Sequence, residues 1–219
     1  MSELYNTLDI LKKIEETKVI SIIRKIETDN ILAAVGSLHL GGIRSIEITM
    51  DSPNALKSIE RVKNAFVGKM LIGAGTVLDK ETAREVILAG ADFILSPTLS
   101  TGVIEMCNRY SKLAVPGVFT PTEALTAWQA GAGLVKVFPV SSVGPGYIKD
   151  LLGPLSQLRL LPVGGVGIDN ADSFIKAGAF AVGIGGALVS EKDVKQKKFK
   201  EIEERSKAVI KKVKEAQIK

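Results

Sequence analysis

The chain has 219 residues, a formal net charge of +5 and a hydrophobic fraction of 46%, so it can build the core of one large α/β domain or of two small ones. Its single cysteine excludes an internal disulfide and a multi-cysteine metal site, and a lone histidine cannot build a zinc site without several carboxylates. No apolar run is long enough to span a bilayer and no signal-peptide pattern is present, which predicts a cytoplasmic protein with no membrane partner.

Strand-like and helix-like runs alternate along the whole chain, after a short amphipathic helix expected at about residues 3–17. The strand-like runs are residues 19–24, 45–50, 71–77, 93–97, 113–118, 134–139, 158–164 and 181–188. The helix-like runs between them are residues 29–40, 54–66, 80–88, 101–110, 122–130, 147–152 and 170–177. This repeat of about 20–26 residues predicts one α/β domain over residues 1–219, a (β/α)8 TIM barrel. A Rossmann-like sheet is the main rival, but its glycine signature is incomplete at Gly73-Ala74-Gly75.

An amphipathic C-terminal helix is expected at about residues 194–216, where apolar residues recur at helical spacing among lysines and glutamates. The mixed signs favour a solvated helix with one face packed on the body over a nucleic-acid-binding arm. No interleaving of aromatic and basic residues typical of single-strand binding occurs, so we expect no nucleic-acid partner. The modest positive charge suits an anionic small-molecule substrate.

A lysine stands inside the apolar strand predicted at residues 134–139. Side chains alternate along a strand, so Lys136 and Phe138 share one face. Burial lowers the pKa of a lysine and supplies a neutral amine, the nucleophile of Schiff-base chemistry. The alternative is a lysine that reaches water at a strand end or pairs with a carboxylate.

Other polar residues fall near the carboxyl ends of predicted strands, where TIM barrels carry their active sites. Arg24 ends the first strand, Glu47 lies in the second and Thr76 ends the third. A buried glutamate needs a partner or a raised pKa, so Glu47 is either an acid–base group or half of a structural ion pair with Lys136 or Arg24. Thr76 could equally cap a helix.

Two glycine-rich turns follow the last two predicted strands. Gly164 and Gly165 follow the seventh strand, and Gly185 and Gly186 follow the eighth. Barrels commonly bind phosphate there through backbone N–H groups, so these glycines predict a phosphate or similar anion site.

Together these motifs resemble the family of 2-keto-3-deoxy-6-phosphogluconate (KDPG) and 4-hydroxy-2-oxoglutarate aldolases, from about residue 19 to residue 189. The motifs that carry the resemblance are Ile46-Glu47-Ile48-Thr49, Gly73-Ala74-Gly75-Thr76-Val77, Ser96-Pro97, Pro116-Gly117, Thr120-Pro121-Thr122-Glu123, Val135-Lys136-Val137-Phe138-Pro139 and Pro162-Val163-Gly164-Gly165-Val166.

The resemblance implies a metal-independent class I aldolase without a cofactor, which forms pyruvate and an aldehyde from a 2-keto acid. Lys136 would form the Schiff base and Glu47 would shuttle protons. Thr76 and Pro97 would line the pyruvate pocket, with Phe138 as an apolar wall. The resemblance also implies a homotrimer.

Two departures from the family pattern concern the substrate. Met50-Asp51-Ser52-Pro53 stands where KDPG-specific members carry an arginine, and the segment is closer to the 6-phosphogalactonate branch, in which an arginine matching Arg24 would bind the substrate carboxylate. Ala187 stands where some members place a phosphate-binding serine. Two other functions stay open: a phosphosugar isomerase or epimerase, and a non-catalytic protein that binds a phosphorylated ligand.

Overall fold

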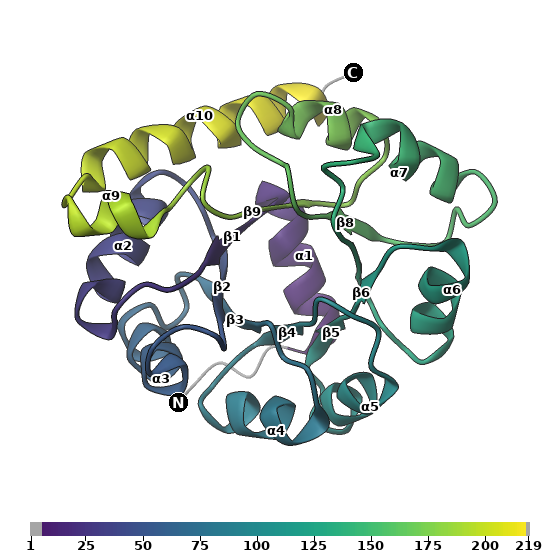
Figure 1. The fold of residues 1–219 in the computed structure, drawn as a ribbon, viewed down its shortest axis with the longest axis horizontal. Helices are drawn as coiled ribbons and strands as arrows, with labels where there is room; N and C mark the ends of the chain where they lie inside the picture. Colours follow the sequence, from purple (N-terminus) through teal and green to yellow (C-terminus); the bar gives the residue numbers. More distant parts are fainter. Residues whose placement is uncertain (1–5, 218–219) are drawn as a thin grey trace.

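The computed structural model describes residues 6–217, which form a ring of short parallel strands surrounded by helices (Figure 1). Residues 3–5 of the first expected helix lie outside the described residues. The strands are β1 (Val19–Ile23), β2 (Ser45–Thr49), β3 (Leu71–Gly75), β4 (Phe93–Leu95), β5 (Leu113–Val115), β6 (Gly117–Val118), β7 (Val135–Val137), β8 (Leu160–Pro162) and β9 (Val182–Ile184). All eight predicted strand segments therefore contain strand, and the α/β class is confirmed.

The strands form a six-stranded sheet in the order β5-β4-β3-β2-β1-β9 and a three-stranded sheet in the order β6-β7-β8. The expectation of one continuous strand at residues 113–118 was wrong, because Pro116 divides it into β5 and β6. Proline has no N–H to donate to a ladder, so β5 pairs with β4 while β6 pairs with β7. A parallel bridge between Val163 and Gly183 links the ends of β8 and β9. The result is a curled, TIM-barrel-like parallel sheet.

Helices follow the strands on the outside of the ring, except for the first helix, which precedes β1 and is seen within the ring (Figure 1). They are α1 (Thr7–Thr17), α2 (Thr28–Leu40), α3 (Ala55–Ala65), α4 (Lys80–Leu88), α5 (Thr101–Arg109), α6 (Pro121–Gln129), α7 (Gly144–Leu152), α8 (Ala171–Lys176), α9 (Glu191–Lys195) and α10 (Phe199–Gln217). Three helices end at Ala-Gly pairs, where Gly90, Gly131 and Gly178 adopt the left-handed conformation with φ values of 98°, 94° and 100°.

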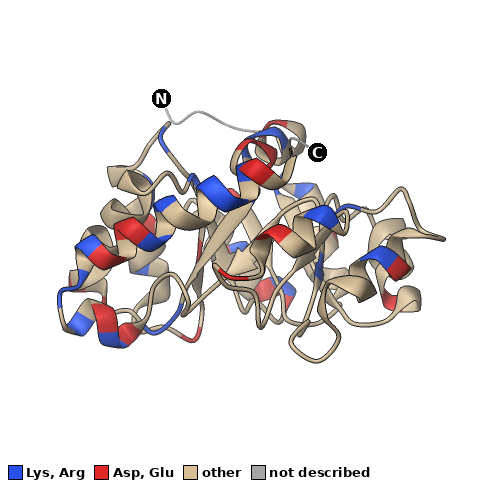
Figure 2. Ribbon diagram, turned by 90° about the horizontal axis from the view of Figure 1, so that it is seen from above, with Lys and Arg blue, Asp and Glu red and all other residues tan. Residues whose placement is uncertain are grey.

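The single helix expected at residues 194–216 is instead two helices, α9 and α10. Residues 196–198 separate them, and Lys197 has a φ of 54°, which interrupts helical geometry. The expected packing of the apolar face is confirmed: α10 buries Ile202, Val209 and Val213 against the body, where it contacts α2 and α8. Lysines and glutamates are mixed along its outer face (Figure 2). No helix within residues 6–217 is long and apolar enough to cross a membrane.

Alternation along the strands separates an outer core from an inner one. On β7, Val135 and Val137 pack outward against the helices, and on β2 Ile46 and Ile48 do the same. The inner cluster includes Ile20, Ile22, Phe93 and Leu161, together with Ile10, Leu11 and Ile14 of α1, which packs near the strand starts at Leu113 and Gly133. Lys136 lies between the outward-facing valines of β7, and Glu47 lies between the outward-facing isoleucines of β2. Both side chains therefore face the interior of the ring.

Candidate active site

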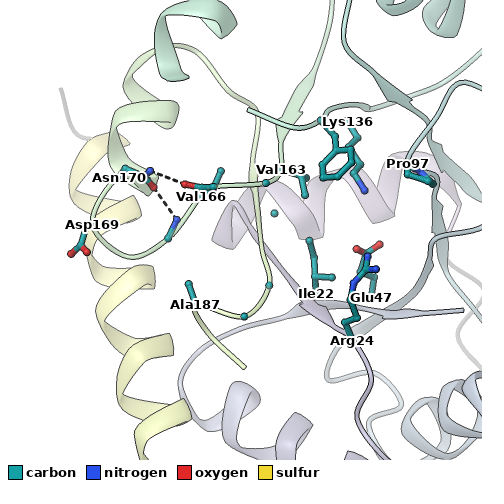
Figure 3. Close-up of a pocket in the computed structure, with 17 residues that line it drawn as sticks. Ile22, Arg24, Glu47, Pro97, Lys136, Val163, Val166, Asp169, Asn170 and Ala187 are labelled. Carbon is teal, nitrogen blue, oxygen red and sulfur yellow. Dashed lines mark hydrogen bonds between the residues drawn. The ribbon is translucent and has the colours of Figure 1, made fainter. Parts of the chain in front are cut away.

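A cavity of about 660 Å³ opens at the carboxyl ends of the strands (Figure 3). Nine of the ten residues predicted for the site line it: Arg24, Glu47, Pro97, Lys136, Phe138, Gly164, Gly165, Gly185 and Gly186. The tenth, Thr76, is not part of the lining. Ile22, Asp169 and Asn170 also line it and were not predicted for the site, although strand alternation places Ile22 on the inward face.

Lys136 lies on the middle residue of β7 and is almost completely buried, with 5% of its surface exposed. Its Nζ atom lies 4.8 Å from the centre of the Phe138 ring, so an apolar side chain flanks the amine. Burial lowers the pKa of Lys136, the charge of Glu47 opposes that change, and the charge of Arg24 reinforces it. The surroundings therefore favour the neutral, nucleophilic form of the amine.

Glu47 is more deeply buried, with 1% of its surface exposed, and its Oε2 atom has no hydrogen-bond partner. Among residues 6–217, no cation lies within the 4.0 Å of a direct ion pair with it. Burial raises the pKa of Glu47, although the charges of Lys136 and Arg24 oppose that change. The carboxyl group fits because its neighbour on β3 is Gly75, where a Cβ atom would collide with it. Glu47 is thus a buried carboxyl group with an unpartnered oxygen rather than half of a direct structural salt bridge.

Arg24 follows β1, and its half-exposed side chain lies at the cavity. One terminal nitrogen donates to Asp51 Oδ2 at 2.9 Å, and the other donates to Thr76 Oγ1 at 3.3 Å. Thr76 has a φ of 58°. The structure thus places Thr76 in hydrogen-bond contact with Arg24 and not in the cavity wall.

Pro97 follows β4 and reaches the cavity because Gly117 of β6 lies against it. A Cβ atom at Gly117 would collide with the Pro97 backbone. Glycine at this position lets the two chain segments approach closely.

The glycine turn after β8 is braced by a side chain from the following segment. Asn170 accepts a hydrogen bond from the Gly167 N–H and donates one to the Gly165 carbonyl, both at 2.9 Å (Figure 3). Gly164 and Gly165 have φ values of 86° and 83°, which favour glycine. Around Gly186, in contrast, no atom lies within 4 Å of the place a Cβ would take, so the wall there is open. Asn170 is the first residue of the helix predicted at residues 170–177, and an asparagine at a helix start was a signal for hydrogen bonds from the side chain to nearby backbone.

The sequence model of the family described as "KDPG and KHG aldolase" matches residues 10–205. This chain belongs to the KDPG and KHG aldolase family. The 2-dehydro-3-deoxy-6-phosphogalactonate aldolase of Escherichia coli K12 is 39% identical over 171 residues, which cover 78% of this chain and 83% of that protein. The 2-dehydro-3-deoxy-phosphogluconate aldolase of Haemophilus influenzae is 36% identical over 196 residues, covering 88% and 90%.

Solved structures of the family have the same fold. The structure described as native KDPGal superposes with a TM-score of 0.86 at 35% identity, covering 92% of this chain and 96% of that chain. The KDPG aldolase of Legionella pneumophila, captured with pyruvate as a covalent carbinolamine, gives a TM-score of 0.84 at 28% identity, with the same coverage. As the family name indicates, its members are aldolases and hence carbon–carbon lyases.

Proposed function

We propose that this protein is a class I aldolase that cleaves a 2-keto-3-deoxy-6-phospho-aldonate, or 4-hydroxy-2-oxoglutarate, into pyruvate and an aldehyde. The observation that carries the proposal is the pairing of two buried groups at one cavity: the Lys136 amine, with a lowered pKa, and the unpartnered Glu47 carboxyl, with a raised one. Groups whose pKa values are shifted in opposite senses are suited to nucleophilic and acid–base roles.

The reaction would begin when the neutral Lys136 amine attacks C2 of the keto acid. Protonated Glu47 would supply a proton for loss of water from the carbinolamine, which leaves an iminium ion on Lys136. The iminium accepts the electrons of the C3–C4 bond as Glu47, as a base, removes the proton of the C4 hydroxyl. The aldehyde leaves, and the enamine is protonated at C3 and hydrolysed to pyruvate.

The remaining lining residues fit roles in substrate binding. Arg24 would bind the carboxylate next to the reacting carbon, with Thr76 orienting Arg24 from behind. Pro97 and Phe138 would form the apolar walls around the pyruvate part. Backbone N–H groups of the glycine turns at residues 164–165 and 185–186 would bind a terminal phosphate.

Among the possible substrates, we favour the 6-phosphogalactonate derivative. The E. coli enzyme of that name is 39% identical to this chain, and Arg24 stands at the end of the first strand, as in that branch. Ala187 at the open wall removes a possible hydroxyl donor to phosphate, so a phosphate would rely on the glycine turns.

We further propose that the two sheets act as one closed eight-stranded barrel in a single catalytic domain, and that the enzyme is a homotrimer. The Val163–Gly183 bridge supports closure, as does the fact that Pro116 alone separates β5 from β6. Exposed leucines at positions 40, 78 and 88 supply apolar surface that subunits could cover. Light scattering of the purified protein tests the trimer.

The proposal is tested by measuring pyruvate release with and without EDTA. The substrates are the 2-keto-3-deoxy derivatives of 6-phosphogluconate and 6-phosphogalactonate, and 4-hydroxy-2-oxoglutarate. We expect cleavage that EDTA leaves unchanged and that Lys136→Met abolishes. Turnover retained in folded Lys136→Met, or a divalent-cation requirement, would overturn it. Interconversion of phosphosugars without pyruvate release would instead support an isomerase or epimerase.

A further inference from the structure

Arg24, which lines the cavity, is paired with a carboxylate, Asp51, that is not part of the lining. Arg24 and Asp51 follow the adjacent strands β1 and β2, and Arg24 donates to Asp51 at 2.9 Å. Their side chains are 52% and 34% exposed, so both are accessible from solvent. The pair therefore stands where an incoming carboxylate would have to meet Arg24.

Hydrogen bonds hold the two loops in this arrangement. The Lys25 N–H donates to Ser52 Oγ at 2.8 Å, which ties the loop after β1 to the loop after β2. Ser52 is buried, and its hydroxyl also lies 3.1 Å from that of Thr49. Asp51 precedes this anchored serine, so its backbone is held beside the loop that carries Arg24.

Asp51 changes the charge that a substrate would encounter. A guanidinium can bind one carboxylate with two parallel hydrogen bonds, but here one terminal nitrogen already serves Asp51 and the other serves Thr76. A substrate carboxylate must therefore share Arg24 with Asp51 or displace it. The negative charge of Asp51 also repels the approaching anion.

We propose that Asp51 is a specificity-determining residue that competes with the substrate carboxylate for Arg24. This inference rests on the function proposed above. Asp51 would weaken the binding of every 2-keto acid at Arg24, pyruvate included, so that tight binding depends on a second anionic group bound by the glycine turns. The covalent step on Lys136 does not involve Asp51.

The half-saturating concentration for Schiff-base formation tests this role. The protein is incubated with pyruvate or with its uncharged methyl ester, reduced with borohydride, and the adduct on Lys136 is quantified by peptide mass spectrometry. In Asp51→Asn, the amide oxygen can still accept from Arg24 but carries no charge. We expect the pyruvate concentration at half-saturation to fall by about two- to fivefold, with no change in that concentration for methyl pyruvate.

A matched control removes a carboxylate that pairs with a different arginine. Asp29 lies 3.7 Å from Arg61 and does not line the cavity, so Asp29→Asn should leave both half-saturation values unchanged.

A second readout is the pH profile of Schiff-base formation. The negative charge of Asp51 contributes to the raised pKa of Glu47. The part of the profile that reflects titration of Glu47 should therefore move to lower pH in Asp51→Asn.

The possible failures are distinguishable. Absence of any Lys136 adduct in the unaltered protein would overturn the proposed function and this inference together. A normal adduct in the unaltered protein, with half-saturation by pyruvate unchanged or increased in Asp51→Asn, would overturn only the competition by Asp51. An equal gain for pyruvate and methyl pyruvate would do the same, because it would show an effect that does not depend on the substrate charge.

Discussion

Two combinations of a lysine with a buried carboxyl group differ in how the carboxyl group is partnered. Lys63 of α3 contacts both oxygens of Asp92 at 2.5 and 2.7 Å, and Asp92 also accepts from the Ile72 N–H at 2.9 Å. Lys136 and Glu47 are buried at the cavity, but no direct ion pair joins Glu47 to a cation within residues 6–217. Both oxygens of Asp92 accept hydrogen bonds from neighbouring groups, whereas one oxygen of Glu47 has no hydrogen-bond partner.

The difference follows from where each group lies. Asp92 immediately precedes β4, at the amino ends of the strands, and it joins that end to α3 and β3. Glu47 lies inside β2, beside a glycine on β3, and opens into the cavity. In TIM barrels the amino ends of the strands serve stability and the carboxyl ends serve chemistry. A satisfied and an unsatisfied buried carboxyl group therefore distinguish the end of this molecule that we expect to serve stability from the end that we propose carries the chemistry.

The largest effect is expected at Lys136. Replacing it with methionine removes the proposed nucleophile while it keeps an unbranched apolar side chain in the interior. We expect the rate of pyruvate release to fall by about a thousandfold or more, because the covalent route is lost. Steady-state kinetics measure the rate, and circular dichroism checks the fold; substantial turnover by the folded variant would contradict the assignment.

The matching change at the other pair, Lys63→Met, should damage stability instead. It leaves Asp92, which is almost fully buried, without its cation, and we expect unfolding free energy to fall by about 3 kcal/mol. Urea denaturation measures the loss. Turnover per folded molecule should be preserved, and a large loss of turnover with little loss of stability would reverse the proposed contrast.

Glu47→Gln should reduce activity and stabilise the protein in a pH-dependent way. The rate should fall by about a hundredfold or more, because the amide cannot transfer protons. The folded-state pKa of Glu47 is raised, so its protonated form favours folding below the ordinary glutamate pKa, and this contribution is lost as pH rises through the raised value. The variant should therefore gain stability relative to the unaltered protein as pH rises, measured by urea denaturation from pH 5 to pH 8. A constant difference across that range would contradict a raised pKa.

The smallest effect is expected at Asn170, a satisfied polar group at the cavity. Asn170→Ala removes both braces of the glycine turn after β8. We expect KM for a phosphorylated substrate to rise by about thirtyfold, since two hydrogen bonds of about 1 kcal/mol each are lost. Trapping of pyruvate on Lys136 should be unchanged, and an equal loss in both assays would indicate general unfolding of the site.

The sequence predicted which residues meet at the cavity, because strand alternation and the strand-end rule place Lys136, Glu47 and Arg24 on one interior end. It did not predict their distances. Whether Glu47 pairs with a cation depends on side-chain geometry across β2 and β3, and the space for its carboxyl group depends on Gly75. The pairing of Arg24 with Asp51 depends on the loops tied by Ser52, which strand and helix patterns do not describe.

Two element boundaries differ in whether the sequence contained a signal for them. Pro116 within a strand-like run was a visible signal that the strand would divide, since proline cannot donate to a ladder. The break between α9 and α10 had no such signal, because residues 196–198 include neither glycine nor proline. There the Lys197 backbone takes a positive φ that its side chain alone would not favour.

The most direct test of the contrast maps the pyruvate adduct over all lysines after borohydride reduction at neutral pH. The amine of Lys136 has a lowered pKa and opens into the cavity, whereas that of Lys63 is bound to Asp92. We expect Lys136 to carry nearly all of the adduct and Lys63 to carry none. No adduct on Lys136 in folded protein, or an adduct spread over exposed lysines, would contradict the claim that the unsatisfied pair is the reactive one.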